Sequence, residues 1–225
     1  MSQKCNEINN LKVKDLPRAL KRETLTPCFY CLIENAEANC ITLNNAGIKC
    51  SNDLFEMMST ESGLVSIAGK TNIPKDYIIG LFYLHNLFSF KPIRLKKLEI
   101  INTEDIEKLE LKKIIETKTL LLNGKTNKQR EILSKKLEIS IANLEKYIIA
   151  ADLMRLKGVQ TVKSKLYMAV GVKSLKMLGK QNPGEFRLKL EECLQKTNIA
   201  KAIPKAKEML SDITWAGLHP EVIDI

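Results

Sequence analysis

The chain has 225 residues and a mass of 25.5 kDa, and its shares of apolar residues (44%) and charged residues (28%) exclude a wholly disordered protein. Ten glycines and seven prolines exclude a collagen-like or linker-dominated chain, and an aromatic content of 5% leaves few rings to stack on unpaired bases. The two histidines, His85 and His219, are too few for most histidine-based catalytic or zinc sites. We therefore expect a folded protein that is not an enzyme and uses no cofactor.

The net charge of +10 is spread unevenly along the chain. Acids and bases balance in residues 1–90, so residues 91–225 carry the entire excess. A basic half beside a neutral half indicates an acidic partner, with nucleic acid first and a membrane surface or an acidic protein second. The alternative is that the lysines only reflect a composition rich in lysine, isoleucine and asparagine.

The sequence carries no recognisable export or membrane-spanning signal. Residues 1–26 hold no apolar run that could form the core of a signal peptide. The most apolar stretch, residues 77–90, is too short to span a bilayer and has His85 and Asn86 in its middle, so we expect a buried helix there. Six cysteines without an export signal are typical of reduced thiols. We expect a cytoplasmic protein without a membrane partner.

Helical signals recur along the chain, whereas strand signals are weak. The first helix is expected to start at Thr26-Pro27, with Thr26 as its N-cap, and to end at Gly47 in a left-handed conformation. Its apolar stripe, with spacings of three and four, consists of Phe29, Leu32, Ala36, Cys40 and Leu43. Ser51 is expected to cap the next helix, and later starts are expected at Pro74, Thr103, Ser140, Thr161 and Pro183. The pattern predicts an all-α chain of about ten to twelve helices.

Two blocks of the sequence recur in the same order. Residues 43–54 align without gaps on residues 95–106, and Gly47-Ile48-Lys49 matches Gly171-Val172-Lys173 further on. A second block recurs after 66 residues, where Thr60 falls on Thr126, Ile73 on Ile139, Leu87 on Leu153, Lys91 on Lys157 and Ile93 on Val159. Single matches between apolar helices arise by chance, but two blocks in the same order favour a tandem repeat.

The repeats divide the chain into five segments. We predict a poorly defined N-terminal segment at 1–26, helical repeat one at 27–90, helical repeat two at 91–155, a basic repeat three at 156–215 and an extended tail at 216–225. No linker rich in proline, glycine or serine separates the repeats, so we expect them to pack side by side.

The stretch from Met154 to Leu178 carries a recognisable motif. Its Leu156-Lys-Gly-Val159 turn resembles the helix-hairpin-helix module, in which an apolar-Gly-apolar-Gly turn joins two helices and the second helix offers free backbone N–H groups to a phosphate. The order of residues 151–175, followed by Asn182-Pro183, resembles an uncharacterised prokaryotic family of tandem, degenerate helix-hairpin-helix repeats, of the domain-of-unknown-function type. The resemblance covers about residues 40–215 and is strongest from 126 to 212. It implies tandem helix-hairpin-helix-like repeats related to non-specific DNA binders, without catalytic residues.

The sequence departs from the module at two glycine positions. Gly158 matches the first hairpin glycine, but Gln160 stands where the second is expected, and Pro92 replaces the first glycine in repeat two. A Cβ at the second position can block the close backbone approach that phosphate binding needs. Thr161 is still expected to cap the following helix and donate its hydroxyl. An alternative role, in which these turns only hold helix pairs together, stays open.

Charge favours phosphate binding by repeat three. Residues 153–184 hold seven lysines and arginines and no acid, which is uncommon in a chain with 28% charged residues of both signs. The candidate nucleic-acid-binding residues are Arg155, Lys157, Gly158, Gln160, Thr161, Lys163, Lys165, Lys173, Lys176 and Lys180.

Four cysteines form a weak metal-binding pattern, C-x2-C-x8-C-x9-C. They are Cys28, Cys31, Cys40 and Cys50. Zinc sites use CxxC because one turn can direct both thiolates at one ion, but zinc knuckles usually contain two such pairs and this chain has one. We expect no metal site, and we interpret these cysteines as small buried hydrophobic residues.

The sequence thus favours a non-catalytic protein that binds nucleic acid, DNA rather than RNA, through phosphates and without sequence preference. The alternative is an adaptor or complex subunit whose hairpins have lost phosphate binding and whose partner is an acidic protein. Gln160 and Pro92 favour the adaptor, whereas the acid-free basic stretch favours nucleic acid.

Overall fold

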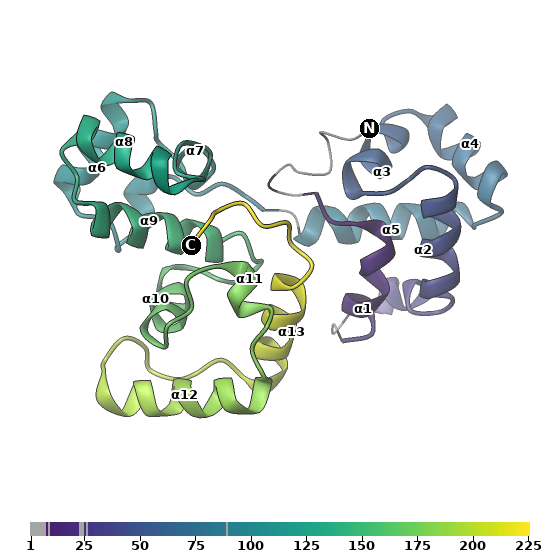
Figure 1. The fold of residues 1–225 in the computed structure, drawn as a ribbon. Helices are drawn as coiled ribbons and strands as arrows, with labels where there is room; N and C mark the ends of the chain where they lie inside the picture. The colour runs from purple at the N-terminus through teal and green to yellow at the C-terminus, as the bar shows by residue number, and fades with distance from the viewer. Residues whose placement is uncertain (1–7, 9, 23–24, 26, 89) are drawn as a thin grey trace. The chain divides into compact units, whose positions relative to one another are not determined.

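The computed structural model describes residues 8, 10–22, 25, 27–88 and 90–225. This part of the chain contains thirteen α-helices and no strand (Figure 1). The predicted all-α fold is confirmed, with more helices than the sequence pattern indicates. No helix within the described residues is long and apolar enough to cross a membrane.

The chain divides into two compact units. The N-terminal unit comprises Met1–Ser89 with Leu218–Pro220, and the C-terminal unit comprises Phe90–Gly217 with Glu221–Ile225. The segments predicted as repeats two and three both belong to the C-terminal unit.

In its described part, the N-terminal unit contains five α-helices and two 3-10 segments. The α-helices are α1 (Leu16–Leu20), α2 (Ala36–Asn45), α3 (Ser51–Met58), α4 (Glu61–Thr71) and α5 (Lys75–Phe88), and the 3-10 segments are Val13–Asp15 and Pro27–Leu32. α2 packs against α1, whereas α5 packs against α3, α4 and the second 3-10 segment. Leu32, Leu43 and Leu81 are fully buried and mark the core between these elements.

The C-terminal unit is built around α9. Its helices are α6 (Thr103–Leu111), α7 (Thr117–Asn123), α8 (Asn127–Leu137), α9 (Ile141–Leu153), α10 (Thr161–Ala169), α11 (Leu175–Leu178), α12 (Pro183–Lys196) and α13 (Ala206–Ala216). α7, α8 and α10 pack against α9, and every residue from Tyr147 to Leu153 is buried. α12 contacts α10 and α13. Because the end of α9 is buried, the segment that follows it begins inside the core.

Helix α4 recurs as α8, with the same bounds, 66 residues later. α4 follows the N-cap Thr60 and α8 follows the N-cap Thr126, and each threonine oxygen accepts the backbone N–H three residues on. The C-cap residues of α4 and α8 are Asn72 (φ 58°) and Glu138 (φ 54°), both in the left-handed region, and the isoleucine that follows each is buried. The predicted match of these two blocks therefore agrees with the backbone.

A turn with the same hydrogen bonds occurs three times. Gly47, Lys113 and Gly171 have φ values of 96°, 59° and 90°, so the predicted left-handed conformation of both glycines is confirmed. In each turn the next residue donates its N–H to the carbonyl five positions earlier, at 3.0 or 3.1 Å. This bond satisfies a helix-terminal carbonyl, as in a Schellman motif. The next helix then starts three residues on, after the N-caps Cys50, Glu116 and Ser174.

The predicted alignment of residues 43–54 on residues 95–106 is correct only in its second part, where α3 and α6 begin at the matched positions Ser51 and Thr103, and it is wrong in its first part. Residues 95–97 form a 3-10 segment, whereas Leu43 lies within α2. The backbone equivalent of Gly47 is Lys113. It has a positive φ and the same turn hydrogen bond, although it is not a glycine. A non-glycine residue in the left-handed region is uncommon, so the sequence does not indicate the turn at Lys113.

The first predicted helix also differs from the structure. Its N-cap, Thr26, lies outside the described residues. Pro27–Leu32 is a 3-10 segment, and α2 starts only at Ala36, after Asn35 with φ of 55°. The apolar stripe still faces the core, because Leu32 and Ala36 are buried on both sides of the break. The N-cap of α3 is Cys50 and not the predicted Ser51.

Candidate nucleic-acid interface

The basic stretch of residues 153–184 begins at the end of α9 and includes the short helices α10 and α11 with the turns that flank them. In the turn before α10, the exposed Gly158 has φ of 81°, a conformation that favours glycine. Leu156 and Val159 are buried, and the N–H of Val159 donates to the carbonyl of Leu156 at 3.2 Å. Two apolar anchors thus hold an exposed glycine turn directly before α10.

α10 starts without a side-chain cap. Its N-cap is Gln160, whose side chain accepts no hydrogen bond from the helix, so the prediction that Thr161 caps it is wrong. The carbonyl of Gln160 accepts the N–H of Ser164 at 2.9 Å. The preceding N–H groups, of Thr161, Val162 and Lys163, have no acceptor within the described chain. Together with the positive end of the helix dipole, these donors can bind an anion.

Arg155 is buried, with a side-chain exposure of 0%. Its guanidinium donates to Asp152 Oδ1 at 2.6 Å, and Asp152 Oδ2 accepts the backbone N–H of Leu175 at 2.8 Å. The pair therefore links the end of α9 to the start of α11. Arg155 presents no group to a phosphate at the surface, so we remove it from the candidate residues.

Lys163 is held by a carboxylate. Its Nζ donates to Asp212 Oδ2 at 2.9 Å, and the two side chains are only 19% and 7% exposed. Burial raises the pKa of Asp212, and the positive charge of Lys163 opposes that rise. Lys163 therefore offers its backbone N–H to an anion more readily than its ammonium group.

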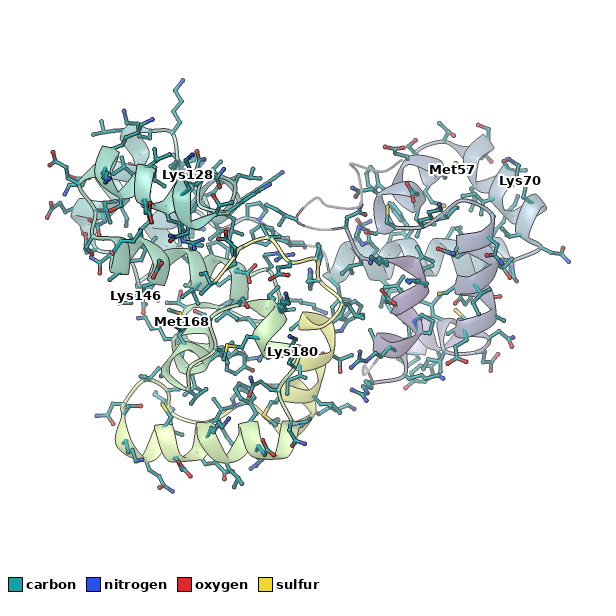
Figure 2. The ribbon with its side chains drawn as sticks, in the orientation of Figure 1. Met57, Lys70, Lys128, Lys146, Met168 and Lys180 are labelled. Atoms are coloured by element: carbon teal, nitrogen blue, oxygen red, sulfur yellow. The ribbon has the colours of Figure 1, made fainter. Side chains whose placement is uncertain are left out.

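The remaining lysines of the stretch lie at the surface. Lys165 is 3.8 Å from Glu99 and Lys176 is 2.6 Å from Glu221, in ion pairs that salt and competing anions weaken. Lys157, Lys173 and Lys180 are exposed as well (Lys180 is labelled in Figure 2). The stretch thus combines an uncapped helix start, an exposed glycine turn and surface lysines.

This arrangement lies within a segment that has relatives. A family model described as "Domain of unknown function (DUF4332)" matches residues 99–216, just over half of the chain. The chain belongs to the DUF4332 family. The resemblance to a family of the domain-of-unknown-function type is thereby confirmed. No curated protein and no solved structure matches the chain.

The DUF4332 domain holds a second acid-free stretch, which the search for motifs missed. Residues 193–207, between Glu192 and Glu208, contain four exposed lysines, which are Lys196, Lys201, Lys205 and Lys207. They come from the end of α12, the loop after it and the start of α13. The signal was visible in the sequence as a run without acids, but no glycine motif accompanies it.

The cysteines considered for metal binding precede the DUF4332 domain. Cys40 and Cys50 are buried, Cys31 is exposed, and the side chain of Cys28 lies outside the description. Burial raises the pKa of Cys40 to about 11, and the Cys50 thiol donates to Asp53 Oδ2 at 3.1 Å. Among the described residues, no three or more His, Cys, Asp or Glu side chains are placed to hold a metal ion. Cys40 packs in the core, and Cys50 serves the start of α3.

Proposed function

We propose that the DUF4332 domain of this chain binds nucleic acid, DNA rather than RNA, through phosphates and without sequence preference. One observation carries the proposal: α10 starts without a side-chain cap inside a basic stretch that contains no acid. A phosphate is the common anion that matches three adjacent backbone donors at the positive end of a helix.

In this proposal the turn from Leu156 to Thr161 acts as a degenerate helix-hairpin-helix turn. Gly158 keeps the surface before α10 free of a side chain, so that a phosphate can approach the N–H groups of Thr161 and Val162. The exposed lysines of the stretch neutralise neighbouring phosphates along the strand. Contacts of this kind position a protein on nucleic acid without reading bases, which is why we expect no sequence preference.

Binding to a labelled duplex of about 20 base pairs, measured by fluorescence anisotropy across a salt series, tests the proposal. The variant Lys157→Glu/Lys173→Glu/Lys180→Glu should lose binding, and log Kd of the wild type should depend steeply on log salt concentration. The matched control is Lys128→Glu/Lys135→Glu/Lys136→Glu, which makes the same charge change on α8 (Lys128 is labelled in Figure 2).

The control separates a local site from a general effect of net charge. It should retain most of the affinity, and both variants should melt as the wild type does. Equal losses in the two variants, or no binding by the wild type at low salt, would overturn the proposal. We place the activity in the cytoplasm, on the sequence argument from reduced cysteines.

A further inference from the structure

A groove of about 920 Å³ lies between the start of α10, the end of α12 and the loop that follows α12. Its lining consists of Val162, Leu194 and residues 197–202. Most of these side chains are aliphatic or small, and Val162 is 49% exposed although it stands in the first turn of a helix. Apolar surface of this kind, rimmed by polar residues, is typical of interaction sites.

Both walls of the groove come from acid-free parts of the chain. Val162 belongs to the stretch 153–184, and the other lining residues belong to the stretch 193–207. Lys201 lines the groove itself, and three further exposed lysines lie on the same stretch. Two carboxylates on the neighbouring helices are already engaged, Glu191 by Arg187 at 2.9 Å and Asp212 by Lys163. The groove therefore complements an occupant with negative charge.

The loop also offers backbone groups for pairing. Within the described chain, no backbone group of residues 198–203 is hydrogen-bonded to another backbone group. These residues are exposed or half-buried, so water satisfies their N–H and C=O groups when the groove is empty. An extended peptide can replace that water by pairing with the backbone, as an added strand does at a sheet edge.

The lining favours a peptide over a strand of nucleic acid. No aromatic side chain is among the lining residues, so an unpaired base finds no ring to stack on. Aliphatic side chains can fill the apolar floor while carboxylates pair with Lys201 and its neighbours at the rim. We propose that this groove binds an extended acidic peptide with aliphatic side chains, supplied by another protein. This interaction goes beyond nucleic-acid binding and does not depend on it.

The test uses the full chain and a fluorescein-labelled peptide of about ten residues that alternates glutamate with valine or leucine. Two variants address the groove: Lys201→Glu reverses the rim charge, and Ala202→Trp fills the space. Each should weaken binding roughly tenfold, provided that thermal melting shows an intact fold. The matched control Lys189→Glu makes the same charge change at an exposed position of α12 that does not line the groove, and it should change affinity by less than about twofold.

Two further probes separate the occupants. A peptide with glutamine in place of glutamate should bind roughly tenfold more weakly, because it lacks the carboxylates. A polyglutamate peptide of the same length should also bind more weakly, because it cannot fill the apolar floor. The proposal is overturned if polyglutamate binds as well as the alternating peptide, if the two groove variants bind as the wild type does, or if oligo-dT displaces the peptide and Ala202→Trp weakens oligo-dT binding.

Discussion

The Lys163 ammonium group donates to Asp212 Oδ2 at 2.9 Å and thereby joins the start of α10 to α13. The hydroxyl of Tyr167 donates to the same oxygen at 2.6 Å. Because Asp212 is almost fully buried, its charge depends on these two donors. Lys163 therefore has a structural role that the basic character of its segment does not reveal, and a charge reversal there would place two carboxylates together.

The first prediction concerns this ion pair. Lys163→Met keeps an apolar stem but removes the cation, so it should lower the free energy of unfolding at pH 7 by about 2 kcal/mol. Burial already raises the pKa of Asp212 in the folded state, and loss of Lys163 should raise it further. The folded state then binds a proton more readily than the unfolded state, so the variant should regain stability as the pH falls.

Urea unfolding of both proteins between pH 7 and about pH 4 measures this effect. The stability difference between wild type and Lys163→Met should shrink as Asp212 takes up a proton. A difference that stays constant over this range would show that Lys163 contributes through packing and not through the charge of Asp212.

The second prediction concerns the turn that occurs three times. Apart from the glycine and its two neighbours in the chain, no heavy atom lies within 4 Å of the position that a Cβ would occupy at Gly47 or Gly171, so a substitution there is penalised only by its positive φ. Gly171→Val should lower the free energy of unfolding by about 1–3 kcal/mol, and Gly47→Val should do the same. Lys113 provides the reverse experiment, since it holds the same conformation with a side chain.

Lys113→Gly should therefore raise the free energy of unfolding by about 0.5–1 kcal/mol, because glycine adopts this φ without strain. Denaturant unfolding of the three variants gives both signs in one protein. Stabilisation by Lys113→Gly together with destabilisation by the valines would establish that one turn geometry recurs. Loss of stability in all three would argue against the shared turn.

The sequence predicts the turns and caps best where the backbone itself requires a residue type. Gly47 and Gly171 have the positive φ that their positions suggested, Ser140 is the N-cap of α9, and Pro183 is the first residue of α12. Each of these residues acts through its own backbone or its immediate neighbours, so one sequence is enough to predict it.

Predictions that depend on long-range packing were less successful. A stripe with spacings of three and four fits an α-helix, but it also continues through the 3-10 segment Pro27–Leu32 and across the break at Asn35. Charge alone could not distinguish a surface lysine of the basic stretch from Arg155, which is buried against Asp152. The acid three residues before Arg155 was a visible hint, since such pairs share a helix face.

The third prediction concerns the C-terminal residues of the chain. Arg130 is 3% exposed at its side chain and donates to Asp224 Oδ1 at 3.0 Å, to the Asp224 carbonyl at 2.7 Å and to the Gly124 carbonyl at 3.1 Å. Arg130→Met should cost about 3 kcal/mol of unfolding free energy, because the buried Gly124 carbonyl and the part-buried Asp224 carbonyl lose their donor. It should also speed digestion of the C-terminal residues by carboxypeptidase.

Asp224→Ala is the matched control for Arg130→Met. The Asp224 carboxylate is 59% exposed, so its removal should cost less than about 1 kcal/mol, while the bond to the Asp224 carbonyl remains. Equal losses from the two variants would mean that the exposed ion pair, and not the carbonyl contacts of Arg130, holds these residues.

The last prediction separates phosphate binding from fold stability at a single residue. Gln160→Asp places a carboxylate at the N-cap of α10, where it can accept the helix N–H groups that Gln160 leaves open. The variant should gain about 1 kcal/mol of unfolding free energy, because it satisfies donors and complements the helix dipole. Its affinity for duplex DNA should nevertheless fall roughly tenfold, since the carboxylate occupies the donors and repels the phosphate. Gln160→Gly, which removes the side chain and adds no charge, should bind at least as tightly as the wild type. Weaker DNA binding by this more stable variant could not come from unfolding. Unchanged affinity would instead exclude the start of α10 as the phosphate site.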